Sequence, residues 1–398
     1  MNPVRRAAAT ALAATVAVAP LAGCESTVAG EAMKASTPAS AVSVALLDTG
    51  PFPTRAGAPF GNAGSAAGGA QLEGIRMAQF VAGPWEVDAT LTQFVFNGMP
   101  IADAQGLKND LGEAAGDVAA AHGFIAGFAT GRSLQGPGLG KSLVNLVLRF
   151  PNPDSAAAAA RGMAAELLRG AVPPHHPSAV PRHPESLASS FTDDNLGTVV
   201  ESYTAHGPYV FYELASTKDR PEIAGELTAN MLDIQAPRID GFAPTDPAQL
   251  ANLPVDPSGL LARTLPPPPG QDPVPAAGVY QQLAELHFET NPAESAQLFT
   301  AAGIEIVTRR WRSRVYQAHD GTGAGRLVDR FVHDTNTKAI AGVNGLPGSQ
   351  CFDQGDQLGA ARFVCVVVVD RYAYMALSGS ETEAKQETAA QYRILAGK

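Results

Sequence analysis

The sequence is poor in the residues and motifs on which most catalytic and metal sites depend. It contains only three cysteines and eight histidines among 398 residues. We find no Gly-x-Ser-x-Gly nucleophile elbow, no His-Glu-x-x-His zinc motif and no Asp-x-Asp-x-Asp-Gly calcium loop. The sequence therefore gives no positive indication of catalysis, and we expect neither a resident metal nor a cofactor.

Basic residues are also scarce, with 28 Lys and Arg against 38 Asp and Glu and a net charge of −10. A chain this acidic is poorly suited to bind nucleic acid through its overall field, so nucleic acid is not an expected partner. One uncharged apolar stretch, residues 7–20, follows Arg5 and Arg6 at the N-terminus. A short cationic segment followed by an apolar core is typical of a signal peptide, and this core is too short to span a membrane.

The apolar stretch ends in Leu21-Ala22-Gly23-Cys24, which resembles the lipobox of bacterial lipoproteins. The resemblance implies that residues 1–23 are removed and that Cys24 carries diacylglycerol on its sulfur. Two or more acyl chains hold a protein on a membrane, where one chain gives only reversible binding. The alternative is an ordinary cleaved signal with Cys24 as a bystander. Residues 24–43 are small and polar, and we predict a flexible tether there.

Cys351 and Cys365 are the two remaining thiols, and a signal peptide would place them in an oxidising compartment. An even pair of cysteines in an exported protein favours a disulfide, with a metal site or free reactive thiols as alternatives. A bridge closing about 15 residues contributes roughly 3 kcal/mol in the chain-entropy model. Because the intervening segment is polar and rich in turn residues, we expect the bridge to join an irregular loop to a strand.

The order of the segments predicts an α+β protein with two related domains, mainly antiparallel sheets and helices packed on one face. We expect domains at residues 44–236 and 276–398, joined by a proline-rich linker at 237–275. In each half an apolar segment ending in Phe is followed by Asn-Pro, at Asn152 and Asn291, which opens a helix. Each half ends in a hairpin followed by another helix.

Four local patterns carry more specific predictions. Residues 42–48 suggest a first strand, and residues 100–121 suggest one amphipathic helix. The glycine-rich stretch 136–142 lacks the first glycine of a phosphate-binding loop, because Gln135 occupies that position, so we expect a turn leading into a strand at 143–150. The proline-rich segment with His175, His176 and His183 favours an exposed loop, with metal binding as the alternative.

Residues 307–317 are the most notable charged segment, and they lie within one predicted strand, residues 304–317. On a strand Arg310, Arg312 and Arg314 would share one face, whereas Arg309 and Trp311 would point the other way. Three guanidinium groups on one face can bind a phosphate or carboxylate, such as a lipid headgroup or wall polymer. The alternative is a solvated face that pairs with nearby acids.

Several segments together resemble a known family. They are the lipobox, LDTGPFPT (47–54), EGIRMAQFVAGPWEVDATL (73–91), and Cys351 and Cys365 with DRYAYMAL and AAQYRIL. The chain is similar in these segments to uncharacterised actinobacterial cell-envelope lipoproteins, typified in mycobacteria and nocardiae, with paired N- and C-terminal domains of unknown function. The resemblance implies a two-domain protein anchored on the outer face of the cytoplasmic membrane, and it implies no reaction.

The C-terminal pair of cysteines is also similar to the pattern in the extracellular sensor domains of mycobacterial receptor kinases. That likeness is an analogy at the level of fold and says nothing about activity. The sequence as a whole favours a non-catalytic protein that binds a small molecule, a lipid or an envelope protein. The alternatives are a hydrolase with a site between the domains and the substrate-binding component of a transporter.

Overall fold

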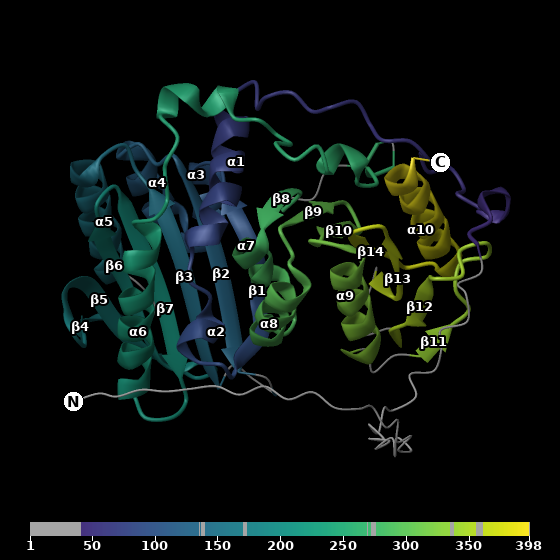
Figure 1. The fold of residues 1–398 in the computed structure, drawn as a ribbon. Coiled ribbons are helices and arrows are strands. Elements are labelled where there is room, and N and C mark those ends of the chain that lie inside the picture. Colours follow the sequence, from purple (N-terminus) through teal and green to yellow (C-terminus); the bar gives the residue numbers. More distant parts are fainter. Residues whose placement is uncertain are drawn as a thin grey trace, which may run out of the picture. The chain divides into compact units, whose positions relative to one another are not determined.

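The computed structural model describes residues 41–397 except for 135, 137–139, 170–172, 269, 272–275, 335–337 and 356–360. Cys24, the predicted signal peptide and most of the predicted tether lie outside these residues. Two seven-stranded antiparallel sheets lie side by side within one compact unit, Ser40–Lys398 (Figure 1). The predicted α+β class with antiparallel sheets is therefore confirmed.

The first sheet is built from the N-terminal half of the chain, and helices pack on it. In spatial order its strands are β1 (Leu91–Ile101), β2 (Ala126–Leu134), β3 (Lys141–Arg149), β7 (Tyr209–Thr217), β6 (Gly197–His206), β5 (His183–Asp193) and β4 (His176–Val180). Its helices are α1 (Ala66–Met77), α2 (Pro84–Val87), α3 (Ala104–Leu111), α4 (Glu113–Ala121), α5 (Pro153–Leu168) and α6 (Glu222–Ile239), with 3₁₀ turns η2 (Ala78–Phe80) and η3 (Pro247–Asn252). Two further 3₁₀ turns, η1 (Val44–Leu46) and η4 (Leu261–Arg263), lie against the C-terminal half of the chain.

The second sheet is built from the C-terminal half. In spatial order its strands are β11 (Lys338–Ile340), β12 (Gln350–Asp353), β13 (Phe363–Val369), β14 (Tyr372–Ser378), β10 (Ser313–Gln317), β9 (Ile306–Arg310) and β8 (Gly278–Gln281). Its helices are α7 (Gln282–Glu285), α8 (Pro292–Ala302), α9 (Gly321–Asp334) and α10 (Glu381–Ala396), with the 3₁₀ turn η5 (Leu286–Phe288) after α7.

Helices cover both faces of each sheet, whereas the sequence led us to expect helices on one face. On β3, Leu143 and Val147 pack with side chains of α6, whereas Leu146 packs with side chains of α3 and α5. In the second sheet α8 and α9 cover one face and α10 covers the other. Burial on both faces explains why β13, with the sequence FVCVVVV, is continuously apolar.

The Asn-Pro signals were correct in both halves. Asn152 accepts a hydrogen bond from the backbone N–H of Ser155 at 2.9 Å, and α5 begins at the following proline. Asn291 caps α8 in the same way, with a longer bond of 3.5 Å from the N–H of Glu294. A side-chain oxygen at this position satisfies one of the free N–H groups at a helix start.

Residues 42–48 and 100–121 do not form the elements predicted for them. The segment 42–48 forms the 3₁₀ turn η1 rather than a strand, and Leu47 enters the core beside the two cysteines. The expected single helix over 100–121 is two helices, because Gly112 adopts a φ of +87°, a backbone angle that ends a helix. The strand β1 also occupies the first residues of that segment.

The histidine-rich segment is part of a hairpin rather than a loop. His176 lies on β4, the edge strand of the first sheet, and His183 begins β5. An edge strand tolerates the prolines that suggested an irregular loop, because one side of its backbone has no partner strand. The glycine-rich stretch leads into β3 as predicted, with residues 135 and 137–139 outside the described part.

The disulfide between Cys351 and Cys365 is confirmed. Its position differs from the expectation, because the two cysteines are direct partners on β12 and β13 with their Cα atoms 4.1 Å apart. The bridge therefore joins two paired strands instead of a loop and a strand. No helix in the described part of the chain is long and apolar enough to cross a membrane.

Candidate ligand-binding site

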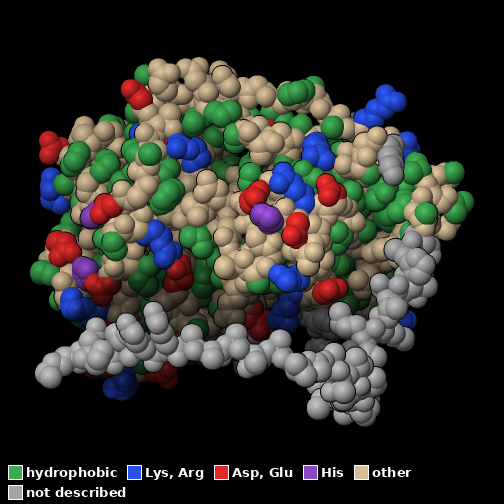
Figure 2. Space-filling model, viewed as in Figure 1, with side chains coloured by type: hydrophobic (Ala, Val, Ile, Leu, Met, Phe, Trp, Pro, Cys, Tyr) green, Lys and Arg blue, Asp and Glu red, His purple; other side chains and the backbone are tan. Residues whose placement is uncertain are grey.

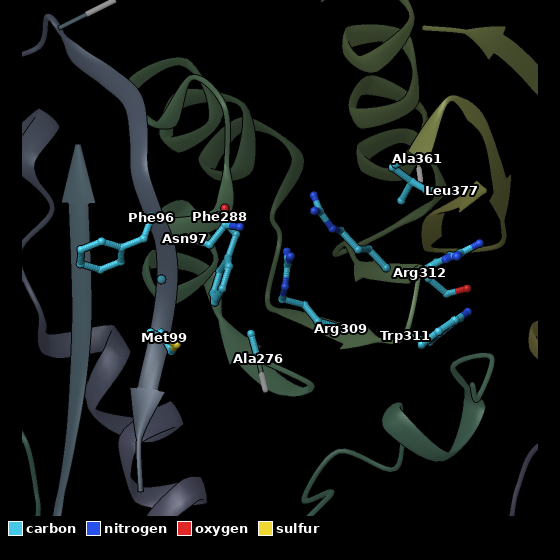
Figure 3. Close-up of a pocket in the computed structure, with 13 residues that line it drawn as sticks. Phe96, Asn97, Met99, Ala276, Phe288, Arg309, Trp311, Arg312, Ala361 and Leu377 are labelled. Carbon is cyan, nitrogen blue, oxygen red and sulfur yellow. The ribbon is translucent and has the colours of Figure 1, made fainter. Parts of the chain in front are cut away.

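A pocket of about 470 Å³ lies between β1 of the first sheet and the β9–β10 hairpin of the second (Figure 3). Pockets of roughly 300–1,000 Å³ hold small ligands in proteins. Figure 3 shows Met99 on the β1 side, then Phe288 and Arg309, and Trp311 with Arg312 at the far side. The remaining lining residues are Phe96, Asn97, Gly98, Ala276, Ser313, Arg314, Ala361 and Leu377.

Arg132 fixes the β1 side of the pocket to η5. This arginine of β2 is fully buried and donates to the backbone oxygens of Thr92 at 2.7 Å and of His287 and Glu289 at 2.9 Å. Its guanidinium also lies 3.6 Å from the ring centre of Phe94. Burial lowers the pKa of Arg132 to about 10, so it remains charged at neutral pH. One buried cation thus connects the two sheets beside the pocket.

A close backbone approach at Gly98 adds to this junction. A Cβ atom at this position would lie 2.7 Å from the Cβ of His287 and 2.9 Å from the ring of Phe128, so only glycine fits. The buried ring of His287 packs on Phe128 and Trp85 and has Nε2 3.1 Å from the carbonyl oxygen of Ala78. Burial lowers the pKa of His287 to about 4, which keeps it neutral.

The arginine-rich segment 304–317 is a hairpin and not one strand, so the predicted common face does not form. Arg310 pairs with Ser313 and Arg309 pairs with Arg314 across the hairpin. Arg310 points away from the pocket and donates to the carbonyl oxygens of Leu261 at 3.3 Å and Thr264 at 3.2 Å. The structure therefore brings Arg312 and Arg314 into the pocket together with Arg309, which the sequence placed on the opposite face.

Buried acids behind the lining engage two of these arginines. Glu285 accepts a bond of 2.6 Å from Arg309, and burial raises the pKa of Glu285 to about 7 despite this partner. Glu289 accepts bonds from Tyr316 at 3.1 Å and from Ser295 at 3.0 Å. Burial opposes the charge of Arg314, but Tyr316 and the two carboxylates together raise its pKa.

Arg312 is held more loosely than its neighbours. Its guanidinium lies 3.4 Å from both Ser378 and Glu383, and its side chain is 31% exposed. The adjacent Ser313 is buried, yet its hydroxyl has no hydrogen-bond partner. Bonds of 3.4 Å are at the weak limit for N–H···O contacts, so Arg312 and Ser313 have hydrogen-bonding capacity to spare.

The lining has an unusual charge composition for this protein. Among the residues that the structure describes, the lining contains three arginines and no acidic residue. On the outer face in Figure 2, by contrast, acidic and basic side chains are interspersed. The three arginines of the described lining favour the binding of an anion.

Other residues considered from the sequence lie elsewhere. His175 stacks on Phe191, and His183 lies between Glu185 and Asp233 at 3.0 and 2.9 Å. Over the described ranges, His, Cys, Asp and Glu form no group of three placed to hold a metal ion. Sequence reasoning missed Met99 and Phe288; the only signal was the alternation of aromatic and polar residues in β1.

The fold and pocket define a class: an α+β protein of two antiparallel sheets with a cationic, largely apolar pocket between them. The chain belongs to the DUF7373 family. Residues 60–255 match the Domain of unknown function (DUF7373) N-terminal, and residues 260–398 match its C-terminal counterpart. The predicted pairing of N- and C-terminal domains is therefore confirmed.

Two further comparisons add little to this assignment. The curated proteins contain no match to the chain. Among solved structures, the extracellular domain of PknH from Mycobacterium tuberculosis is similar at 14% identity, covering 40% of this chain and 94% of that one with a TM-score of 0.28. A score this low does not establish a common fold, and no activity is transferred from it.

Proposed function

We propose that this protein is a cell-envelope lipoprotein of actinobacterial type, whose folded part binds a ligand without chemical change. The sequence Leu21–Cys24 and the tether behind it support an anchor through lipid on Cys24, at the extracytoplasmic face of the cell membrane. The Cys351–Cys365 disulfide supports an exported location, because such bonds persist in oxidising compartments.

The pocket between β1 and the β9–β10 hairpin carries the binding proposal. It combines residues from both sheets, and its described lining residues include three arginines and no acid. Binding sites commonly lie between structural units and combine apolar walls with a few convergent polar groups. The buried Arg132 and the close contact at Gly98 hold the pocket's walls at a fixed separation.

The anchor is tested by labelling cells with a fatty-acid analogue. We expect label on the wild-type chain, no label on Cys24→Ser, and unchanged label on Cys351→Ser as the matched control. An unlabelled wild type would overturn the lipoprotein part of the proposal and leave the binding part standing.

The binding part is tested by native mass spectrometry of the full chain after expression in an actinobacterium. We expect a co-purified molecule with the wild type and its loss with Met99→Trp, which fills the pocket. Val95→Trp places the same side chain on an exposed site of the same strand, outside the pocket lining, and should retain the molecule. Equal retention by both variants would show that the pocket is not the site.

A further inference from the structure

We infer that Glu213 is a proton-dependent switch in the first sheet. As a neutral acid it donates a hydrogen bond to Asn145, and this bond keeps residues 82–85 attached to the sheet. When the proton is lost, two oxygens that only accept hydrogen bonds face each other, and the attachment weakens. This device is separate from the pocket at the β9–β10 hairpin and does not depend on a ligand.

A row of polar side chains crosses the centre of the first sheet. Thr130, Asn145, Glu213 and Ser202 are direct cross-strand partners on β2, β3, β7 and β6. Direct partners share one face of a sheet, with Cβ atoms roughly 4.5–5.5 Å apart. All four side chains are fully buried, and Gln235 of α6 contacts Asn145 on the same face. Polar groups buried in this way need hydrogen-bond partners.

The hydrogen bonds of this row leave two facing oxygens without a donor. Asn145 donates its two amide hydrogens to the carbonyl oxygen of Ala82 and to the side-chain oxygen of Gln235, both at 2.9 Å. These two acceptors fix the orientation of the amide, because the reversed orientation would bring its oxygen against them. Ser202 donates to one carboxyl oxygen of Glu213 at 2.8 Å. In the described part of the chain, Oδ1 of Asn145 and Oε1 of Glu213 have no partner.

A proton on Glu213 supplies the missing donor. An ionised carboxylate and an amide oxygen both act only as acceptors, so neither satisfies the other. With the proton on Oε1, Glu213 donates to Asn145 and still accepts from Ser202. Burial raises the pKa of Glu213 to about 8, although the bond from Ser202 acts in the opposite direction. The geometry and the pKa both favour the neutral acid at neutral pH.

The cations on this face of β2 and β3 are bonded to other groups. Arg132 donates to backbone oxygens, and the remaining pairs are Lys141 with Asp88 and Arg149 with Glu73. None of these three cations therefore balances a charge on Glu213.

The other titratable groups around Glu213 do not balance its charge either. On α6, Arg238 is paired with Glu86, whereas the acids Glu222, Glu226 and Asp233 are exposed. At the end of the β6–β7 hairpin, His206 contacts Asp240, and Tyr209 carries no positive charge. Glu201, Tyr203 and Tyr212 point to the opposite face of the sheet. An ionised Glu213 would thus be a buried charge without a counterion, which is costly.

Asn145 connects this row to the segment before α2. Its amide holds the carbonyl oxygen of Ala82, whose N–H donates to Gln235 at 2.8 Å. Gln235 also donates to the carbonyl oxygen of Phe80 at 2.9 Å. A negative charge beside the oxygen of Asn145 would displace this amide and weaken both of its bonds. The protonation state of the sheet is therefore linked to the position of residues 80–85.

Trp85 lies at the end of this segment and can report the change. Its ring packs edge-on against His287 of the second half, with 5.2 Å between ring centres. The guanidinium of Arg132 lies 5.4 Å from the centre of the same ring. A shift of residues 82–85 would alter both contacts, and the fluorescence of an indole depends on such neighbours.

The test follows the fluorescence of Trp85 with pH. The chain has two tryptophans, so the full chain carrying Trp311→Phe leaves Trp85 as the single one. We expect a transition with its midpoint near pH 8. Glu213→Gln in this background should abolish the transition, because glutamine donates to Asn145 and does not ionise. Glu201→Gln, at a buried acid on the opposite face, is the matched control and should retain it.

Two further measurements locate the proton. Infrared difference spectra between about pH 6 and about pH 10 should show the loss of the C=O band of a protonated carboxyl, and Glu213→Gln should lack this band. Ser202→Ala removes a donor that stabilises the charged carboxylate, so the midpoint should rise by about one pH unit. A purely structural role of Ser202 would change stability without moving the midpoint.

Contrary results would overturn the inference at different points. A transition that persists in Glu213→Gln would assign the proton to another group. A wild type without the carboxyl band at about pH 6 would mean that Glu213 is ionised there, with a buried water donating to both oxygens. A band lost at high pH without a change in Trp85 would mean that the proton does not control residues 82–85. Should Glu213→Gln fail to fold, an unmoved midpoint in Ser202→Ala would overturn the inference.

Discussion

The two sheets share a sequence of local elements but connect them differently. In each half a capped helix is followed by two hairpins and a final helix: α5, β4–β5, β6–β7 and α6 in the first, and α8, β9–β10, β13–β14 and α10 in the second. In the first sheet the hairpins meet through β5 and β6. In the second they meet through β10 and β14, so the last hairpin is reversed relative to its neighbour.

The insertion of α9, β11 and β12 accounts for this difference. Because β12 pairs with β13, the free edge of the β13–β14 hairpin is β14, which then pairs with β10. The comparison shows that caps and hairpins follow the local sequence, whereas the connection between hairpins depends on which edges other strands occupy. The comparison also indicates where mutations should change the stability of the two sheets in the same way and where they should not.

The largest effect is expected where the two sheets meet. Arg132→Met removes three hydrogen bonds to buried carbonyl oxygens contributed by both halves. We expect a loss of about 4 kcal/mol in the free energy of unfolding, measured by urea denaturation. Arg161→Met on the surface is the control. A loss below about 1 kcal/mol for Arg132→Met would mean that the sheets do not depend on this junction.

Replacing a buried glutamate with glutamine should change the free energy of unfolding in opposite directions in the two sheets. Glu213 of the first sheet has no cation, and burial raises its pKa to about 8; Ser202 donates to one oxygen at 2.8 Å and the other has no partner. Its contribution to stability is present below its ordinary pKa and is lost as pH rises toward 8. Glu213→Gln should therefore stabilise the protein at pH 8 by about 3 kcal/mol and flatten the pH dependence.

Glu285→Gln in the second sheet is the matched comparison. It leaves the largely buried Arg309 without its carboxylate, so at pH 8 it should destabilise the protein. Urea denaturation from pH 5 to pH 8 measures both variants. The same sign for both would mean that the pairing with Arg309 has no energetic consequence.

The disulfide is specific to the second sheet. The double variant Cys351→Ser, Cys365→Ser should lower the free energy of unfolding by about 2–3 kcal/mol, because it releases a closed loop in the unfolded chain. Thermal unfolding with and without reductant measures this loss. The reductant should lower the melting temperature of the wild type to that of the variant and leave the variant unchanged. A wild type insensitive to complete reduction would contradict the expectation.

The smallest effects are expected at the two helix caps. Asn152→Ala should cost about 1 kcal/mol, and Asn291→Ala should cost less, because its bond is 3.5 Å long against 2.9 Å for Asn152. Urea denaturation of each variant at neutral pH measures the pair. Asn→Gly at each site controls for the backbone conformation of the cap. A larger cost at Asn291 would reverse the order that the geometry indicates.

Much of the fold could be read from the sequence where one residue type has one physical role. Asn152 followed by proline fixed a helix start, and the apolar run after residue 142 fixed a buried strand. The reversal at Trp311 could not be read in this way. Trp311 adopts a φ of +53°, a conformation that turn sequences usually mark with glycine or asparagine, so nothing in the sequence signalled a turn.

The same turn at Trp311 explains which arginines of the hairpin line the pocket. In one strand Arg309 and Arg314 point to opposite faces, but a two-residue turn between them places them opposite each other on the same face. Arg312 and Arg314 therefore line the pocket, whereas Arg310 does not. The β1 side of the pocket was missed because no strand was predicted over Leu91–Ile101.

The position of the disulfide has a consequence for the register in which β13 pairs with β12. The sequence of this strand, FVCVVVV, is apolar on both faces, and both faces are covered by helices. A shift by one residue would exchange the two sets of valines with little loss of burial, so apolar patterning alone does not select one alignment. A covalent bond between Cys351 and its partner Cys365 excludes the shifted alignments and selects the one in which Val364 and Val366 face α8 and α9.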